Sequence, residues 1–100
     1  MVDGRELLVT SLVNLTTPED CQALLQDLLT PREIATLAQR VAVAAALLRG
    51  ATYEQAKATT GASAATISRV RRALYHGRGG YRQALAGVGG RSSSLELGDI

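Results

Sequence analysis

The sequence predicts an all-helical protein. Helix-start signals divide it into short segments, and apolar residues recur within these segments at helical spacing. No stretch alternates with period two for long enough to form a strand. Alanine, which favours helices and lets them approach closely, is abundant. The length of 100 residues, 46% of them hydrophobic, allows one domain.

Three helices are predicted before Gly50. Asp3 is placed to cap the first, with Glu6 in capping-box position, and leucine and valine side chains follow along residues 5–15. Thr17-Pro18 and Thr30-Pro31 each combine a cap with proline at the first helical position, so they start a second helix and a longer one over 31–48. The second half of the 31–48 helix is apolar nearly all round, so we expect a second chain to cover part of it.

Shorter helices are predicted after Gly50. Thr52 can cap a helix over 53–60, and 61–63 forms a tight turn before a helix over 64–74. A last short helix is expected at 81–85. Residues 87–100 are rich in Gly and Ser, so we expect a single helical domain over 1–86 and a flexible tail over 87–100.

Composition limits the classes of site. The single histidine, His76, and single cysteine, Cys21, leave no intrachain disulfide and no metal site of several His or Cys ligands. No apolar run reaches the ~18–20 residues of a membrane span, and MVDGRELL lacks the features of a secretory signal, so a cytoplasmic protein is expected. Cys21 is expected to be a small buried hydrophobe. With three Tyr and no Phe or Trp, the core is thin, which favours completion by dimerisation.

Charge is distributed unevenly along the chain. Residues 1–48 carry a net charge of −3, residues 49–91 carry +7, and residues 92–100 carry −2. The basic segment has one acidic residue, Glu54. A basic half joined to an acidic one is typical of nucleic-acid binders, although an arginine-rich solvated surface gives the same pattern.

Residues 53–74 carry the pattern of a helix-turn-helix. Ala56 is small and faces inward, Gly61 tolerates a positive φ in the turn, and Ser63 can cap the second helix. Ile67 is placed to pack back on the first helix. The second helix would then enter a major groove. The predicted DNA-binding residues are Lys57, Ser63, Ala64, Ala65, Ser68, Arg69, Arg71 and Arg72.

Several motifs in register resemble the Trp repressor superfamily, and more closely its Trp-repressor-like YerC/YecD branch. They are LLQDLLTP at 24–31, RV at 40–41, LLRG at 47–50, GA at 61–62 and ATISR at 65–69, and YRQAL at 81–85 resembles the last helix of the family. The resemblance implies an intertwined helical dimer with one helix-turn-helix per chain. The two chains would intertwine through 5–48 and the helix near 81–85.

The resemblance also implies a candidate ligand pocket. In the Trp repressor, tryptophan lies between two arginines, and Arg40 and Arg69 match those positions, with Thr30 and Thr66 at two further pocket positions. Two departures disfavour a ligand: Val70 stands where the repressor has glycine, so its side chain would intrude, and Ala73 replaces a serine. The segment before the turn of the helix-turn-helix is also one residue shorter here than in the Trp repressor. We therefore expect no cofactor, and neither tryptophan nor another small effector is expected as corepressor.

The predicted function is that of a sequence-specific regulator of transcription, a repressor type, binding double-stranded DNA as a homodimer and without membrane association. Two alternatives stay open. One is a DNA-binding protein of replication initiation, and the other is a helical adaptor dimer that does not bind DNA. No catalytic grouping of Ser/His/Asp, Cys/His or paired carboxylates is apparent, so an enzyme is not expected.

Overall fold

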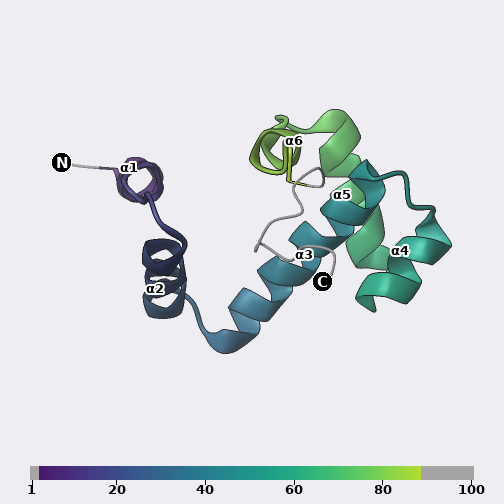
Figure 1. The fold of residues 1–100 in the computed structure, drawn as a ribbon, viewed down its shortest axis with the longest axis horizontal. Coiled ribbons are helices and arrows are strands. Elements are labelled where there is room, and N and C mark those ends of the chain that lie inside the picture. Colours follow the sequence, from purple (N-terminus) through teal and green to yellow (C-terminus); the bar gives the residue numbers. More distant parts are fainter. Residues whose placement is uncertain (1–2, 89–100) are drawn as a thin grey trace. The chain divides into compact units, whose positions relative to one another are not determined.

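The computed structural model describes residues 3–88, which form helices joined by turns, with no strand in that range. The chain divides into two compact units, one ending at Ala35 and one beginning at Thr36. The helices are α1 (Gly4–Val13), α2 (Pro18–Leu28), α3 (Pro31–Leu48), α4 (Tyr53–Thr60), α5 (Ala64–His76) and α6 (Gly80–Ala84) (Figure 1).

This architecture confirms the predicted all-helical class and the six expected segments. Three boundaries differ: α5 continues to His76, two residues beyond the prediction, and α6 runs from Gly80 to Ala84, one residue earlier than predicted at each end. Helix ends are the least certain part of a pattern-based prediction because the last turn has few constraints in sequence. The extent of the domain over 1–86 stays a prediction, and the expected tail lies, beyond Val88, outside the described residues.

The predicted N-caps form at the helix starts, but the capping box expected of Asp3 and Glu6 does not, because the Asp3 carboxylate accepts the N–H of Arg5 and Glu6 makes no return bond. Backbone N–H groups donate to the side chains of Asp3 and Thr17 over 3.2 and 3.1 Å. Thr30 and Glu33 form a capping box, in which the N–H of Glu33 donates to the threonine hydroxyl over 3.1 Å and the N–H of Thr30 donates to the carboxylate over 2.9 Å. These bonds satisfy amide groups that the first helical turn leaves unpaired.

In the first unit, α1 and α2 bury no residue. The apolar side chains of α1 are between 45% and 75% exposed, and they are Leu7, Leu8, Val9, Leu12 and Val13. Cys21 is exposed as well, so its expected burial is wrong within the single chain. The reason is that the first unit, which contains α1 and α2, forms no buried core of its own.

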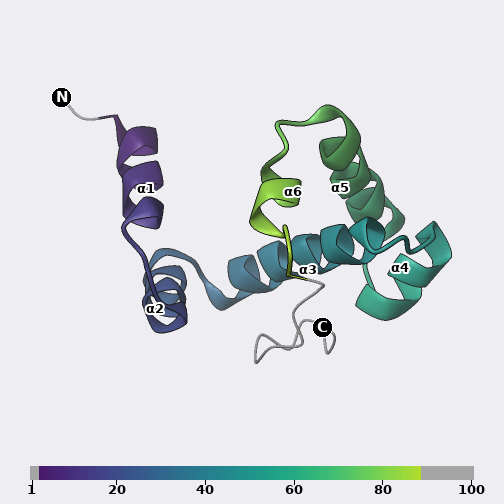
Figure 2. The ribbon, with the colours of Figure 1, turned by 45° about the horizontal axis from the view of Figure 1, so that its top comes forward.

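The core lies in the second unit, where α4 and α5 pack on the C-terminal half of α3 (Figures 1 and 2). It comprises Val43, Ala44, Ala46, Ala56, Ala62, Ile67, Val70 and Leu74. Residues 42–46 of α3 are all buried. We expected a second chain to provide part of this cover, and that expectation needs correction, because α4–α6 of the same chain already bury the segment.

The turn between α4 and α5 depends on one backbone conformation. Gly61 ends α4 with φ +71°, and its N–H donates to the carbonyl of Lys57 over 2.9 Å. A Cβ on Gly61 would meet no atom within 4 Å, so the constraint is the backbone angle and not space. Glycine adopts this left-handed conformation without the Cβ penalty that other residues carry.

Gly61→Ala should therefore lower the free energy of unfolding by about 1–2 kcal/mol, through the left-handed backbone alone. Urea denaturation followed by circular dichroism measures this change. Gly80→Ala is the matched control, because Gly80 is also free of neighbours within 4 Å but has no positive φ. A Gly61→Ala variant as stable as the Gly80→Ala variant would show that the turn tolerates another geometry.

Candidate nucleic-acid interface

Helix α5 has one buried and one exposed side. Ile67 and Val70 are each 1% exposed and Leu74 is 7% exposed, so the spacing of three and four residues places them on one face against the core. This anchoring fixes the rotation of α5 about its axis. The opposite side is therefore held outward by packing.

All eight residues predicted to contact DNA are exposed. Lys57 lies in the last turn of α4, Ser63 is the N-cap of α5, and the others lie on α5 itself. Arg69 and Arg72 are one turn apart on the outward side, and neither has a hydrogen bond or ion pair within residues 3–88. Ala64 and Ala65 keep the start of the helix narrow. The structure thus brings together the predicted set, while its contact with DNA stays a prediction.

Hydrogen bonds hold the start of α5 in place. The hydroxyl of Ser63 accepts the N–H of Thr66 over 3.2 Å, and the hydroxyl of Thr60 accepts the N–H of Ala62 over 3.2 Å. The side-chain amide of Gln39 on α3 donates to the carbonyl of Thr60 over 3.4 Å. The turn that leads into α5 is consequently tied to the end of α4, and the end of α4 is tied to α3.

Positive charge gathers in the part of this unit that follows Glu54. From Gln55 to Val88 the chain carries six lysine and arginine residues and no Asp or Glu. Three of the arginines, Arg69, Arg71 and Arg72, fall on α5. An exposed cationic helix without internal carboxylates is suited to a polyanion, because its charges are not already paired.

Tyr75 and His76 extend this surface and were not among the predicted contacts. With Ser68, Arg71 and Arg72 they line an open hollow along the last turns of α5. Tyr75 is 62% exposed, whereas Tyr53 and Tyr81 are half-buried against the core. The composition of the sequence did not distinguish Tyr75 from the other two tyrosines. The signal that could have singled out Tyr75 is its spacing of seven from Ser68, which puts both on one side of the helix.

A second open hollow corresponds in part to the expected ligand pocket. It is lined by Thr36, Gln39, Arg40, Ala65, Thr66 and Arg69. Three of the four predicted residues therefore meet there. The fourth, Thr30, belongs to the first unit, where it caps α3.

The expected obstruction by Val70 needs correction. Val70 is 1% exposed, belongs to the core cluster and does not line this hollow. The branched side chain points inward because its position shares the buried face with Ile67 and Leu74. Ala73 is half-buried and does not line the hollow either.

Residues 3–88 hold no group of three or more His, Cys, Asp or Glu able to bind a metal ion. Within the same range, every helix is too short or too polar to cross a bilayer.

The model of the Trp repressor protein family matches residues 4–88, which include both hollows and every helix described above. The chain belongs to the Trp repressor family. It is also 46% identical over 84 residues to the uncharacterized protein YerC of Bacillus subtilis (strain 168), covering 82% of this chain and 81% of that protein. The predicted superfamily and the YerC branch are confirmed.

Two solved structures share the fold. A crystal structure provisionally assigned as a Trp repressor from Staphylococcus aureus superposes with a TM-score of 0.82 at 33% identity, covering 93% of each chain. A TrpR-like protein from Eubacterium eligens ATCC 27750 gives a TM-score of 0.77 at 35% identity, covering 88% of this chain and 91% of that one. Family membership and fold together indicate a DNA-binding regulator.

Proposed function

We propose that this protein is a transcription regulator of the repressor type that binds double-stranded DNA sequence-specifically as a homodimer in the cytoplasm. The observation that carries the proposal is the exposed side of α5, where Arg69 and Arg72 lack partners within residues 3–88 while Ile67 and Val70 lock the helix orientation. A rigid cationic helix with a narrow start can enter a major groove.

Division of labour within the surface follows from side-chain chemistry. Arginine can bind guanine edges with two hydrogen bonds, so Arg69 and Arg72 are suited to base recognition. Ala64 and Ala65 allow close approach to base edges and thymine methyl groups. Lys57 on α4 and Arg71 on α5 are suited to phosphates, which supply much of the affinity and its salt dependence. In a homodimer, two such helices would occupy successive major grooves about 34 Å apart.

The double variant Arg69→Ala/Arg72→Ala should weaken duplex binding by at least about tenfold, since each lost arginine contact is worth roughly 1–3 kcal/mol. Fluorescence anisotropy with mixed-sequence duplexes at two salt concentrations measures the loss. Arg49→Ala, which removes a charge from the end of α3, is the control and should bind almost normally.

Unchanged binding by the double variant would place the DNA-binding surface elsewhere. If the unmodified protein fails to bind any duplex at low salt, the regulator proposal falls and the helical adaptor replaces it. Sites located at a replication origin and not at promoters would favour replication initiation over repression.

Dimerisation is proposed because α1 and α2 expose apolar surface that their own unit does not cover. Short isolated helices are marginal in water, so their stability must come from packing. A second copy of the chain would supply that packing along residues 5–48.

We expect sedimentation equilibrium to give twice the chain mass of 10.5 kDa. Leu12→Glu should raise the dimer dissociation constant at least about tenfold, because it buries a charge in the interface. Gln22→Glu introduces the same side chain at an exposed polar position and should leave the mass unchanged. A monomeric unmodified protein at micromolar concentration would overturn the homodimer.

DNA binding is proposed to occur without tryptophan. Five of the six residues that line the hollow at Arg40 and Arg69 are polar or charged, and Ala65 is the sole apolar one. Ligand sites for aromatic molecules are mostly apolar and enclose the ligand, so this lining is a poor fit for an indole ring.

Adding tryptophan should therefore change the duplex dissociation constant by less than about twofold, a shift of under ~0.4 kcal/mol. Isothermal titration calorimetry of the protein with tryptophan alone provides an independent check and should show no saturable heat. A tenfold gain in duplex affinity would restore tryptophan as corepressor.

A further inference from the structure

Tyr75 is an unusual exposed aromatic residue. It lies one residue before the end of α5, and 62% of its surface is accessible. The other two tyrosines pack against the core. Its ring is therefore not needed to fill the interior, and it stands beside the cationic surface of Arg71 and Arg72.

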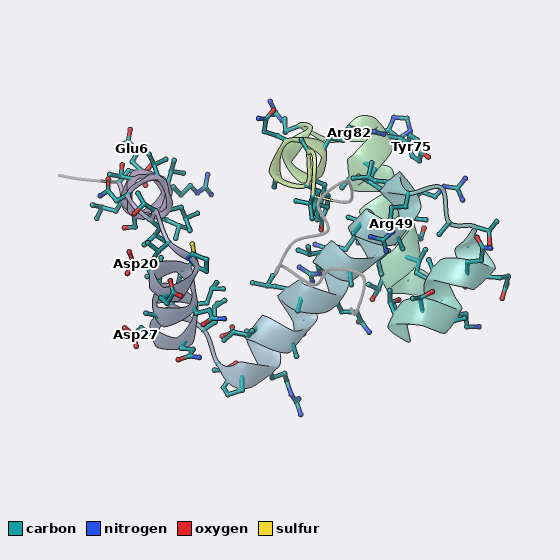
Figure 3. The ribbon with its side chains drawn as sticks, in the orientation of Figure 1. Glu6, Asp20, Asp27, Arg49, Tyr75 and Arg82 are labelled. Atoms are coloured by element: carbon teal, nitrogen blue, oxygen red, sulfur yellow. The ribbon has the colours of Figure 1, made fainter. Side chains whose placement is uncertain are left out.

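Arg82 of α6 is anchored against this tyrosine. Its Nε–H donates to the carbonyl of Leu74 over 3.2 Å, and its guanidinium carbon lies 5.8 Å from the centre of the Tyr75 ring (Figure 3). The last carbonyls of a helix have no partner within the helix, so Arg82 satisfies one of those at the end of α5. The distance to the ring is within the range of a cation–π contact.

The conformation of the link between α5 and α6 places Arg82 beside the C-terminal end of α5. A Cβ on Gly77 would clash with the backbone carbonyl of Ala73, and Gly79 has φ +80°. Both positions therefore favour glycine: Gly77 because a side chain would clash, and Gly79 because of its positive φ. The chain reverses within residues 77–79 and places α6 against α5.

The anchored arginine keeps free hydrogen-bonding capacity. Its Nε is used by Leu74, while its two terminal nitrogens have no hydrogen bond or ion pair within residues 3–88. Tyr75, which the arginine contacts, lines a hollow together with Arg71, Arg72 and His76, and no carboxylate occurs between Gln55 and Val88. An anion is the partner that such a group of donors lacks.

We propose that Tyr75 and Arg82 form a phosphate clamp, which binds the DNA backbone beside the bases contacted by α5. This inference rests on the proposed function. The terminal nitrogens of Arg82 donate to a phosphate, and the Tyr75 hydroxyl donates to the same phosphate or its neighbour. Arg82 also positions the tyrosine ring.

A phosphate fits this pair better than a base edge does. The planar guanidinium group matches two phosphate oxygens, and its orientation is fixed here through Nε. Tyr75 lies at the flank of α5 and not at its outward centre, because it follows directly after the buried Leu74. The clamp thereby extends the footprint beyond the recognition helix without adding sequence preference.

Three variants test the clamp by anisotropy titrations of mixed-sequence duplexes over a range of salt concentrations. Arg82→Ala should weaken binding roughly tenfold and lower the slope of log K against log salt by about 0.9 for each clamp engaged. Arg82→Lys keeps the charge, so the slope should persist, but a single nitrogen cannot hold Leu74 and a phosphate in the same geometry, and affinity should fall about threefold. Tyr75→Phe loses only an exposed hydroxyl and should also cost about threefold, with the slope unchanged.

Arg49→Ala is the matched control, because it removes one arginine from the same unit outside α5 and α6. Its salt slope should stay at the unmodified value. If it falls as far as that of Arg82→Ala, general charge and not a clamp explains the effect, and the proposal is overturned. Thermal unfolding of each variant separates a loss of α6 packing from a loss of phosphate contact, and Tyr75→Phe tests the surface without touching that packing.

A spectroscopic readout distinguishes backbone phosphate from free phosphate. The Nε–H resonance of Arg82 in the 15N-labelled protein should shift on addition of duplex. Inorganic phosphate at the same phosphate concentration should leave it in place, and an equal shift would overturn a DNA clamp.

Failure of this inference differs from failure of the proposed function. If the unmodified protein binds duplex DNA and the Arg82→Ala variant binds with the same affinity and the same salt slope, the clamp alone is overturned. No duplex binding by the unmodified protein overturns both.

Discussion

Close packing of small residues in the second half of α3 is the constraint on which the rest of the structure depends. The five consecutive residues 42–46 are all buried, and four of them are alanines. Because these side chains are small, neighbouring helices can approach α3 from several directions. Ala56 and Ala62 extend this small-residue contact into α4 and the turn. Val43, Ile67 and Val70 fill the remaining space in the core. Their packing fixes the orientation of α5 and therefore determines which of its residues are exposed.

The same helix serves the core and the proposed DNA-binding surface, which explains its composition. Branched and long aliphatic residues occupy the positions that face the core, while serine, alanine and arginine occupy the positions that face outward. The arginine side chains repel one another, but they lie on the exposed side, where water and salt screen this repulsion in the free protein. A polyanion would then replace solvent and counterions around charges that the fold itself leaves unpaired.

The N-terminal helices have the opposite problem, since they carry more apolar surface than their unit can bury. Five large apolar side chains of α1 are exposed, and neither α1 nor α2 has a buried residue. Caps at Asp3 and Thr17 start these helices but do not supply packing. The second chain of the proposed homodimer would cover this surface, and it would couple folding of the protein to its assembly.

By itself the sequence determined the helices, their caps, the Gly61 turn and the exposed arginine side of α5, because these depend on local spacing and on neighbours within four residues. Only the tertiary structure decided three other matters: that the chain's own α4–α6 bury residues 42–46, that Val70 belongs to the core and not to the hollow, and that Arg82 reaches Tyr75 and the Leu74 carbonyl. Each depends on contacts between separate helices. Periodicity shows which side of a helix is apolar, but not which other helix will cover it.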